Sequence, residues 1–383
     1  MDISANIKYV GVNDRVTDLF EGQYRVPNGI SYNSYVIIDE KCAVIDSVDA
    51  RFAKEWIENV KSILGARTPD YLVVQHMEPD HSGSIKEFLD TFGGAKIVSS
   101  DKAFGMMSSF FGCDFKTGGI TVKEGDTLSL GTHTLSFIGA PMVHWPEVIL
   151  SYEASERVLF SADGFGKFGT PDTDEPWEDE ARRYYIGIVG KYGIPVQNLL
   201  KKASKLDINV IAPLHGPVLK ENLAKYISLY DVWSSYRPEE RGVVIAYASI
   251  YGNTRRAAEL LKDTLLERGV KTEIYDLARC DMSEAIAAAF RYDTLVLASV
   301  TYNADVFPPM HAYMHGLVER GFSSRRVALM ENGSWAPSAA KVMRTTLESC
   351  KNIEFTESCV KILSAVNDAS IAEILALADE ICK

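Results

Sequence analysis

The sequence lacks the paired cysteines that mark thiolate metal sites. Its 383 residues include six cysteines, and no two of them form a C-x-x-C pair. Cysteines scattered in this way argue against a thiolate zinc or iron–sulfur site and against a disulfide framework. We therefore expect the cysteines to be reduced and mostly buried, and we expect the protein to be cytoplasmic.

The chain also lacks long apolar runs and an excess of basic charge. No apolar run reaches the roughly 20 residues that a membrane-spanning helix needs. The start of the chain, MDISANIKYV, has neither the basic flank nor the apolar stretch of a signal peptide. With 40 basic and 52 acidic residues, the net charge is -12, which repels phosphate backbones and anionic membrane surfaces. We expect neither a nucleic-acid nor a membrane partner.

The pattern of predicted elements changes near a short polar stretch at 235–241, which contains Pro238. After it, five apolar runs alternate with helical segments, beginning with the run at 242–249 and the helix at 254–268. This alternation predicts a doubly wound α/β domain with a parallel five-stranded sheet over residues 241–383.

Residues 1–240 show a different pattern. Short alternating strands joined by turns fall at 23–47 and 120–140, and helical segments such as 53–64 and 84–92 lie between them. This arrangement predicts a mixed α+β domain with antiparallel hairpins.

The strongest chemical signal follows an apolar strand at 71–75. Four potential metal ligands fall within six positions there: His76, Glu78, Asp80 and His81. His76 and Glu78 are two positions apart in extended chain and so face the same side, while Pro79 fixes the backbone before the second pair. One loop can therefore offer ligands to two neighbouring metal ions.

Three more potential ligands each follow an apolar strand and precede Pro or Gly: His144, Asp163 and His215. Strand-end loops of this kind are rigidly held yet accessible. The seven groups divide into three for one metal, three for a second metal, and a carboxylate that bridges them. Imidazole and carboxylate ligands without sulfur suit iron or manganese and tolerate zinc. A purely structural role could explain one such histidine, but it explains seven residues in strand-end loops poorly.

Three polar loops follow strands in the C-terminal domain, where a doubly wound sheet binds its ligand. They comprise Ser249, Ile250, Tyr251, Gly252, Asn253 and Thr254; Ser299, Val300, Thr301, Tyr302, Asn303 and Ala304; and Asn332, Gly333, Ser334, Trp335 and Ala336. The first loop is rich in hydroxyls, lacks Lys and leads into a helix, which suits a phosphomonoester held at the helix N-terminus. Tyr302 and Trp335 could cover a flavin ring. The alternative interpretation is that these three loops are ordinary polar turns that bind no ligand.

The order His76-x-Glu78-x-Asp80-His81, then His144, Asp163 and His215, resembles the metal site of the flavodiiron proteins. The first C-terminal loop resembles the FMN phosphate loop of flavodoxins. The resemblance implies a metallo-β-lactamase-like αββα domain over residues 1–240 and a flavodoxin-like FMN domain over residues 241–383. Hydrolytic members of that superfamily usually have His where this chain has Glu78. That difference favours a redox-active di-iron centre over hydrolytic zinc.

The resemblance also assigns roles to the ligands. It implies that His76, Glu78 and His144 bind one iron, that Asp80, His81 and His215 bind the other, and that Asp163 bridges them. It implies reduction of O2 to water and/or NO to N2O, with reduced flavin and the two irons together supplying four electrons. Among three tyrosines that follow the bridging carboxylate, Tyr184, Tyr185 and Tyr192, we favour Tyr192 as a hydrogen-bond donor to the bound intermediate.

Electrons are expected to come from a separate carrier such as rubredoxin. The chain contains neither the cysteine pairs of a built-in rubredoxin nor a dinucleotide fingerprint after a strand. A rubredoxin is typically acidic, so docking would need a basic patch, for which Arg255, Arg256, Lys341 and Arg344 are candidates. The resemblance further implies a head-to-tail homodimer in which the flavin of one subunit faces the irons of the other.

Two other functions stay open. One is a zinc hydrolase of the metallo-β-lactamase superfamily with an appended flavodoxin-like domain, and the other is a flavodoxin-like electron carrier whose first domain only binds or docks. Remaining histidines and acids are expected to be structural or solvated. His311 and His315 suit a structural role, His133 suits a solvated turn, and the acidic run at 172–180 suits a solvated helix entry.

Overall fold

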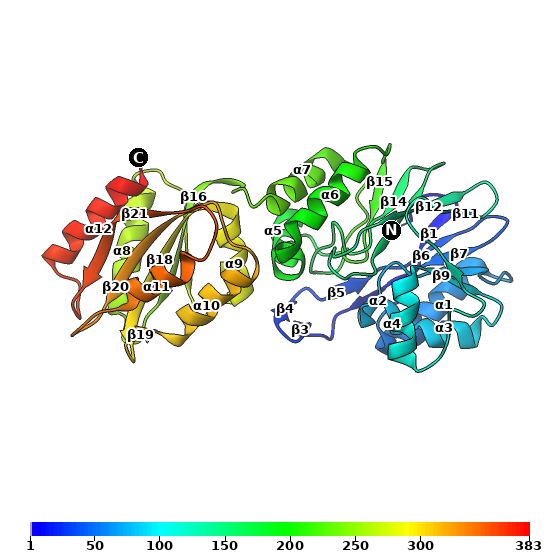
Figure 1. The fold of residues 1–383 in the computed structure, drawn as a ribbon, viewed down its shortest axis with the longest axis horizontal. Coiled ribbons are helices and arrows are strands. Elements are labelled where there is room, and N and C mark those ends of the chain that lie inside the picture. Colours follow the sequence, from blue (N-terminus) through cyan, green and yellow to red (C-terminus); the bar gives the residue numbers. More distant parts are fainter. Residues whose placement is uncertain (1) are drawn as a thin grey trace. The chain divides into compact units, whose positions relative to one another are not determined.

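A computed structural model describes residues 2–383, which divide into two compact units (Figure 1). The first unit comprises Met1–Tyr185 and Ile194–Asp231, and the second comprises Ile186–Gly193 and Val232–Lys383. The predicted division into domains at 240/241 stays a prediction. Within residues 2–383, every helix falls short of the length or the apolar character that crossing a bilayer requires.

Two sheets packed face to face form the centre of the first unit. Their strand orders are β1-β6-β7-β8-β9-β10 and β11-β12-β13-β14-β15, while β2 with β5 and β3 with β4 form two separate two-stranded sheets in this unit. The strands are β1 (Ile7–Tyr9), β2 (Val12–Asp14), β3 (Leu19–Phe20), β4 (Tyr24–Arg25), β5 (Ile30–Tyr32), β6 (Tyr35–Ile37), β7 (Ala43–Ile45), β8 (Tyr71–Val73), β9 (Lys96–Ser99), β10 (Ile120–Thr121), β11 (Thr127–Ser129), β12 (Thr134–Gly139), β13 (Ile149–Glu153), β14 (Val158–Phe160) and β15 (Val210–Ala212).

Helices cover the outer faces of this pair of sheets. They are α1 (Ala53–Leu64), α2 (Pro79–Ser82), α3 (Ile85–Thr91), α4 (Asp101–Phe111), α5 (Trp177–Tyr184), α6 (Gly193–Ala203) and α7 (Leu223–Ser234). Figure 1 shows α1, α3 and α4 beside the first sheet and α6 and α7 beside the second. Apolar side chains from both sheets, among them Tyr35, Val73 and Phe160, fill the space between them. The predicted αββα arrangement is confirmed.

Helix α1 shows how the local sequence builds one of these layers. Its buried side chains Trp56, Ile57, Val60 and Leu64 recur at helical spacing, so one face of the helix packs inward. The helix ends at Gly65, whose φ of 61° few other residues adopt readily. The strand β8 that follows delivers His76 and Glu78 to the edge of the sheet.

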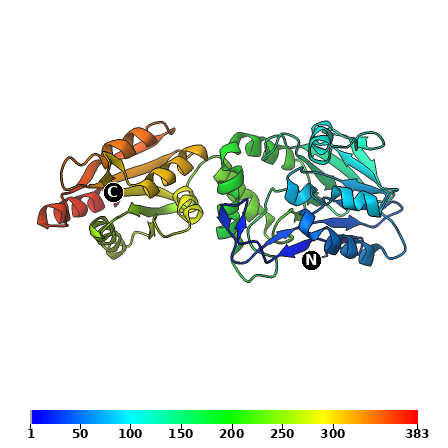
Figure 2. The same cartoon turned by 90° about the horizontal axis from the view of Figure 1, so that it is seen from below.

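The second unit is the predicted doubly wound domain. Its five parallel strands are ordered β17-β16-β18-β20-β21, and β19 pairs antiparallel with β18. The strands are β16 (Glu240–Ala248), β17 (Thr272–Asp276), β18 (Tyr292–Tyr302), β19 (Asp305–Val306), β20 (Arg325–Asn332) and β21 (Ile353–Ile362). The helices are α8 (Asn253–Glu267), α9 (Met282–Arg291), α10 (Pro308–Glu319), α11 (Ala339–Leu347) and α12 (Asp368–Ile381). Figures 1 and 2 show α8 and α12 on one face of this sheet and α9, α10 and α11 on the other.

The sequence predicts a loop at 299–304, and the structure corrects this prediction. Strand β18 continues to Tyr302 and folds back into β19 through a two-residue turn, with Thr301 paired to Val306. Asn303 and Ala304 have φ of 52° and 61°, the backbone of a tight hairpin turn of type I′. The segment is therefore a hairpin, and it fixes the side chains of alternate residues on opposite faces.

The cysteines are less buried than the sequence predicts. All six are free thiols, as expected, but only Cys42 is buried, whereas Cys113, Cys359 and Cys382 are exposed. Their positions explain the difference. Cys113 follows the end of α4, Cys359 lies on the outermost strand β21, and Cys382 follows α12.

Candidate metal centre

The structure brings the seven predicted ligands together in two adjoining groups in the first unit. One group is His76, Glu78, His144 and Asp163, and the other is Asp80, His81 and His215. In each group, one ligand atom from every residue lies within 4.8 Å of the others. Their elements explain the convergence, because strands β8, β14 and β15 and the loop between β12 and β13 end at the same side of the two sheets.

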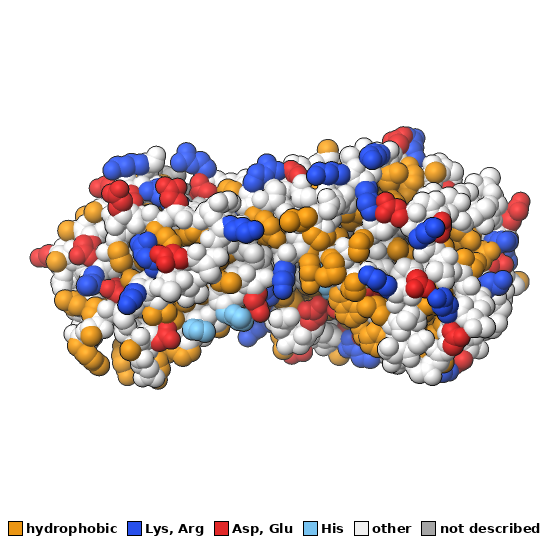
Figure 3. All heavy atoms as spheres, in the orientation of Figure 1, with side chains coloured by type: hydrophobic (Ala, Val, Ile, Leu, Met, Phe, Trp, Pro, Cys, Tyr) orange, Lys and Arg blue, Asp and Glu red, His pale blue; other side chains and the backbone are white. Residues whose placement is uncertain are grey.

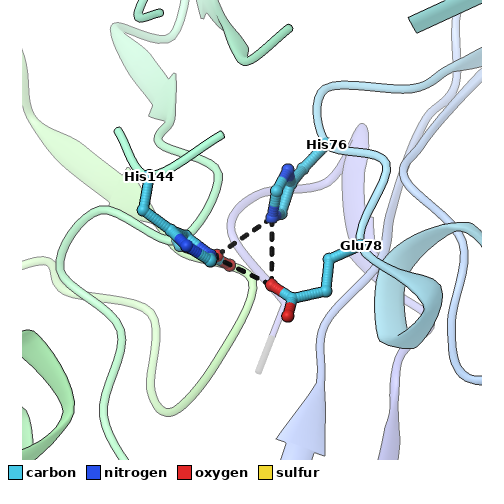
Figure 4. A group of neighbouring side chains, drawn as sticks. His76, Glu78 and His144 are labelled. Atoms are coloured by element: carbon cyan, nitrogen blue, oxygen red, sulfur yellow. Dashed lines mark hydrogen bonds and ion pairs between the residues drawn. The ribbon is translucent and has the colours of Figure 1, made fainter. Parts of the chain in front are cut away.

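In the first group, three side chains point at one another (Figure 4). The Glu78 Oε2 atom lies 3.2 Å from His76 Nε2 and 3.0 Å from His144 Nε2. The Asp163 Oδ2 atom completes the group at 3.4 Å from His76 Nε2 and 3.2 Å from His144 Nε2. Four nitrogen and oxygen atoms therefore face a common point, as ligands of one metal ion do.

The second group uses the other oxygen of the same aspartate. Asp163 Oδ1 lies 3.3 Å from His81 Nε2 and 3.7 Å from His215 Nε2. Asp80 Oδ2 lies 3.3 Å and 3.4 Å from those two atoms. Because each oxygen of Asp163 faces a different group, this carboxylate has the geometry of a bridge between two cations.

Burial and unmet hydrogen bonds support a cationic occupant. Both carboxylate oxygens of Asp80 and of Asp163 are buried and accept no hydrogen bond from any residue of the range 2–383. Burying carboxylates without a partner is costly, and a metal ion supplies the missing interaction. The donor set of imidazole and carboxylate suits iron or manganese and tolerates zinc, as the sequence predicts.

The charges of the group shift the titration of its members. Burial opposes the charging of His144, but Asp163 and Glu78 outweigh it and raise the pKa of His144 to about 9. Burial also opposes the charging of His76, but Asp163 and Glu147 outweigh burial and hold the pKa of His76 well above its ordinary value. Burial would raise the pKa of Asp163, yet His76 and His144 hold it well below its usual range. The carboxylates therefore attract positive charge strongly.

Two contacts orient the histidines from behind. His76 Nδ1 lies 2.8 Å from Glu147 Oε1, and Glu147 also accepts a hydrogen bond of 2.9 Å from the backbone N–H of Met77. His215 Nδ1 lies 2.7 Å from the backbone oxygen of Ser31. Partners of this kind fix which ring nitrogen faces a metal. Sequence reasoning missed Glu147, although its place three residues after His144 was a usable signal.

Of the three tyrosines singled out from the sequence, Tyr184 lies beside the cluster. Its ring lies 5.3 Å from that of His215 and is buried, and the charge of Asp163 adds to burial in raising the pKa of its phenol. Tyr192 lies in a single 3-10 turn, Gly190–Tyr192, of the second unit and is half-buried. The geometry therefore favours Tyr184 over Tyr192, whose proposed role stays a prediction.

His133 is buried, so the expectation of a solvated turn is wrong. Its Nδ1 atom lies 2.7 Å from Asp39 Oδ2, and its Nε2 atom lies 3.1 Å from Glu156 Oε1. Only 4% of His133 is exposed. The turn is covered because the β6–β7 connection brings Asp39 against it, a contact 94 residues away in sequence.

The other discounted groups do not belong to either ligand group. His311 and His315 are exposed on α10, His315 pairs with Glu319 at 3.2 Å, and among residues 2–383 neither joins a group able to hold a metal. In the acidic run, Glu178, Asp179 and Glu180 occupy the first turn of α5, where the helix dipole favours negative charge. Glu175 differs, since it accepts a hydrogen bond from the buried Lys167.

The loops predicted to bind FMN lie at the carboxyl ends of β16, β18 and β20 in the second unit. At the first, α8 begins at Asn253 after Gly252, whose φ is 91°. The N–H groups of the first helical turn have no partner inside the helix, so they can hold a phosphate. Tyr251 and Trp335 are 94% and 83% exposed, and Tyr302 is also exposed. Large exposed aromatic side chains at this edge suit a flat ring system.

Several side chains of these loops are already engaged within the protein. Ser249 Oγ accepts a hydrogen bond from the N–H of Gly252, and Ser299 is fully buried. Thr301 Oγ1 accepts hydrogen bonds from the N–H groups of Ser338 and Ala339 at the start of α11. Asn332 donates to the backbone oxygen of Ser364. These hydrogen bonds hold the loops in shape.

Comparisons with known proteins agree with this architecture. Residues 30–216 match the family described as ODP family beta lactamase, and residues 245–348 match Flavodoxin. An anaerobic nitric oxide reductase flavorubredoxin of Aeromonas hydrophila is 28% identical over 358 residues, covering 90% of this chain and 72% of the relative.

Two solved structures share the fold over nearly the whole chain. The rubredoxin oxygen:oxidoreductase of Desulfovibrio gigas superimposes with a TM-score of 0.92 at 24% identity, covering 100% of this chain and 97% of that one. The flavodiiron protein of Giardia intestinalis gives a TM-score of 0.88 at 24% identity, covering 99% and 95%. At this identity the likeness establishes the fold.

Proposed function

Because the chain belongs to the flavodiiron proteins, we propose that it reduces O2 to water and/or NO to N2O. It is an oxidoreductase whose cofactors are FMN and a di-iron centre. The observation that carries the proposal is the split of Asp163, whose two oxygens face two separate histidine pairs. Two-metal hydrolases also use such a bridge, so the preference for redox chemistry rests on Glu78, which stands where hydrolytic members of the superfamily usually have His.

Each ligand has a defined task in this proposal. His76, Glu78 and His144 would hold one ion, Asp80, His81 and His215 would hold the other, and Asp163 would bridge the two. Bound iron would supply electrons and open coordination positions for the gas. Glu147 keeps the Nε2 atom of His76 directed at the ion, and the backbone oxygen of Ser31 does the same for His215. The buried ring of Tyr184 packs beside the ring of His215, with 5.3 Å between their centroids.

The function is tested by gas consumption. Protein with iron and FMN quantified is reduced without air and then mixed rapidly with O2 and, separately, with NO. We expect reoxidation of the flavin by at least one gas. In Asp163→Asn we expect flavin to be retained and turnover to collapse, whereas Asp207→Asn, which alters an exposed aspartate paired with Arg157, should behave as wild type. Zinc at the site with hydrolysis and no gas consumption would support the hydrolase alternative.

We further propose that a small acidic carrier of the rubredoxin type delivers the electrons to the second unit. On the face drawn in Figure 3, basic and acidic side chains are interspersed, so docking must rely on a local group of basic residues. Arg256 and Lys341 are exposed, whereas Arg255 binds Glu259 at 2.7 Å and Arg344 lies 4.3 Å from the Phe355 ring. Because Arg255 and Arg344 already have these partners, Arg256 and Lys341 are the better candidates.

Charge reversal tests this docking surface. In Arg256→Glu with Lys341→Glu, we expect slower reduction by a rubredoxin and a weaker dependence of the rate on salt, because fewer opposite charges attract the carrier. Lys54→Glu, an exposed change in α1, is the control. An unchanged salt dependence in the double variant would exclude the patch.

The remaining proposals concern assembly and location. A head-to-tail homodimer would let the flavin of one subunit serve the irons of another, and we propose this state from the family resemblance. Sedimentation of the iron- and FMN-loaded protein tests it, because a stable monomer with full turnover contradicts it.

A cytoplasmic location is proposed on the same basis, and fractionation of the source cells would test it.

A further inference from the structure

A small enclosed cavity lies in the first unit behind two of the ligand loops. Its volume is about 20 Å³. Leu150 on β13 and Leu159 on β14 form one wall, and Val196 and Leu199 on α6 form the opposite one. A void of ~10–15 Å³ already admits a water-sized molecule, so this cavity has room for one small guest.

The cavity offers such a guest almost no polar partner. Ser161 and Tyr230 contribute the only hydroxyl groups among the residues that line it. The Ser161 hydroxyl donates to the backbone oxygen of Gly164 at 2.6 Å, and the Tyr230 oxygen accepts the N–H of Phe165 at 2.6 Å. Water needs two to four hydrogen-bond partners to occupy a buried site stably. The cavity therefore suits an apolar, weakly hydrated molecule better than water.

Its position links it to the metal centre. Val143, which lines the cavity, is adjacent in sequence to His144, and Gly164, which also lines it, is adjacent to Asp163. The backbones of the loops that carry two members of the first ligand group thus form part of the cavity wall.

We propose that this cavity is a holding site for the diatomic gas that the enzyme reduces. The proposal rests on the proposed function, since O2 and NO are the apolar, weakly hydrated substrates that such a void would take. A gas molecule leaves water for an apolar space at little cost. Its residence beside the loops of His144 and Asp163 would raise its local concentration at the centre, and so lower the gas concentration needed for half-maximal rate.

Krypton, an apolar atom of similar size, tests binding directly. Crystals of the iron- and FMN-loaded protein are pressurised with krypton, and its anomalous scattering is located. We expect a krypton site between Leu159 and Leu199. Absence of krypton from the cavity of wild type would overturn the proposal, whatever the enzyme's activity.

Variants connect the cavity to turnover. Val196→Ile adds one methylene to the wall and should remove the krypton site and raise the KM for the gas, with kcat at saturating gas unchanged. Val318→Ile, the same change on the exposed side of α10, is its control. Leu199→Ala enlarges the cavity and should strengthen krypton binding without raising KM, with the exposed Leu266→Ala in α8 as control.

The kinetic outcomes separate this proposal from the proposed function. If Val196→Ile loses krypton but keeps the wild-type KM, the holding site is wrong while gas reduction stands. If the fully loaded wild type consumes neither gas, the proposed function fails and the holding role fails with it. Iron content, FMN content and melting temperature of each variant confirm that the centre and the fold are intact.

Discussion

Glu147 and His76 form a buried contact of 2.8 Å between Oε1 and Nδ1, and this contact leaves the Nε2 atom of the ring free to face the ligand group. We expect Glu147→Ala to weaken iron binding about 10–100-fold, because the imidazole loses the partner that orients it. Glu147→Gln keeps an acceptor oxygen and should fall between alanine and wild type. Iron retained after dialysis against graded chelator concentrations measures the effect.

A matched control separates this role from general loss of charge. Glu124→Ala removes an exposed carboxylate that pairs with Lys202 at 2.7 Å, and it should retain iron as wild type does. Equal iron retention in Glu147→Ala and wild type would contradict the orienting role.

Loading of the metal-free protein should release protons. The pKa of His144 is raised to about 9 by Asp163 and Glu78, so at pH 7 the metal-free ring is protonated. A metal ion needs the neutral ring, so binding must displace that proton. Apparent affinity should therefore rise as pH increases toward about 9. Calorimetric titrations with Fe²⁺ in buffers of different ionisation enthalpy give the number of protons released, and a value of zero at pH 7 would contradict the prediction.

The buried His133 should make stability depend on pH. Burial opposes its charging, but Asp39 and Glu156 outweigh burial and raise its pKa, with Glu153 adding to the effect. A raised folded-state pKa stabilises the protein fully below the unfolded value of ~6.5, and the contribution is lost as pH rises through the folded value.

The comparison is made on the metal-loaded protein, so that the ligand histidines stay neutral. The free energy of unfolding in urea is measured for wild type and His133→Gln from below pH ~6.5 to pH values above the raised pKa of His133. We expect the difference in the free energy of unfolding to be largest near pH 6 and to shrink at higher pH. A difference that stays constant with pH would show that His133 acts without its charge.

Thr301 should stabilise the second unit through α11. Its hydroxyl oxygen accepts the N–H groups of Ser338 and Ala339, so Thr301→Val leaves two donors of the helix start without that partner. We expect a loss of about 1 kcal/mol in the free energy of unfolding. Thr346→Val is the control, because that hydroxyl only donates back to Val342 within the same helix. Flavin fluorescence followed during urea unfolding reports on this unit, and equal stabilities would contradict the capping role.

The ligand set was accessible from the sequence because each member follows an apolar strand. His76, His144 and His215 all stand at such strand ends, and parallel or adjacent strands bring their ends together. The doubly wound arrangement follows from apolar runs that alternate with helical segments. For the first 240 residues the pattern predicts only a mixed α+β domain, and the αββα arrangement is what the resemblance to the flavodiiron proteins implies.

What the sequence could not provide depends on contacts between distant segments. Glu147 contacts His76 across 71 residues, and Asp39 covers His133 across 94. Spacing in the sequence does not distinguish Tyr184 from Tyr192, because a π-helical turn at Tyr185–Val189 lies between them. The hairpin after Ser299 was read as a loop because Asn303 and Ala304 are turn residues at its tip.

The sulfur-free cluster has a consequence for how oxidants could damage the protein. Thiolates are oxidised stepwise to sulfenic, sulfinic and sulfonic acids, whereas imidazole and carboxylate ligands are not on that pathway. The exposed thiols are Cys113, Cys359 and Cys382, none of which belongs to a ligand group. Peroxide or nitrosating agents would therefore modify the surface first. The residues that hold the centre would outlast the thiols around them.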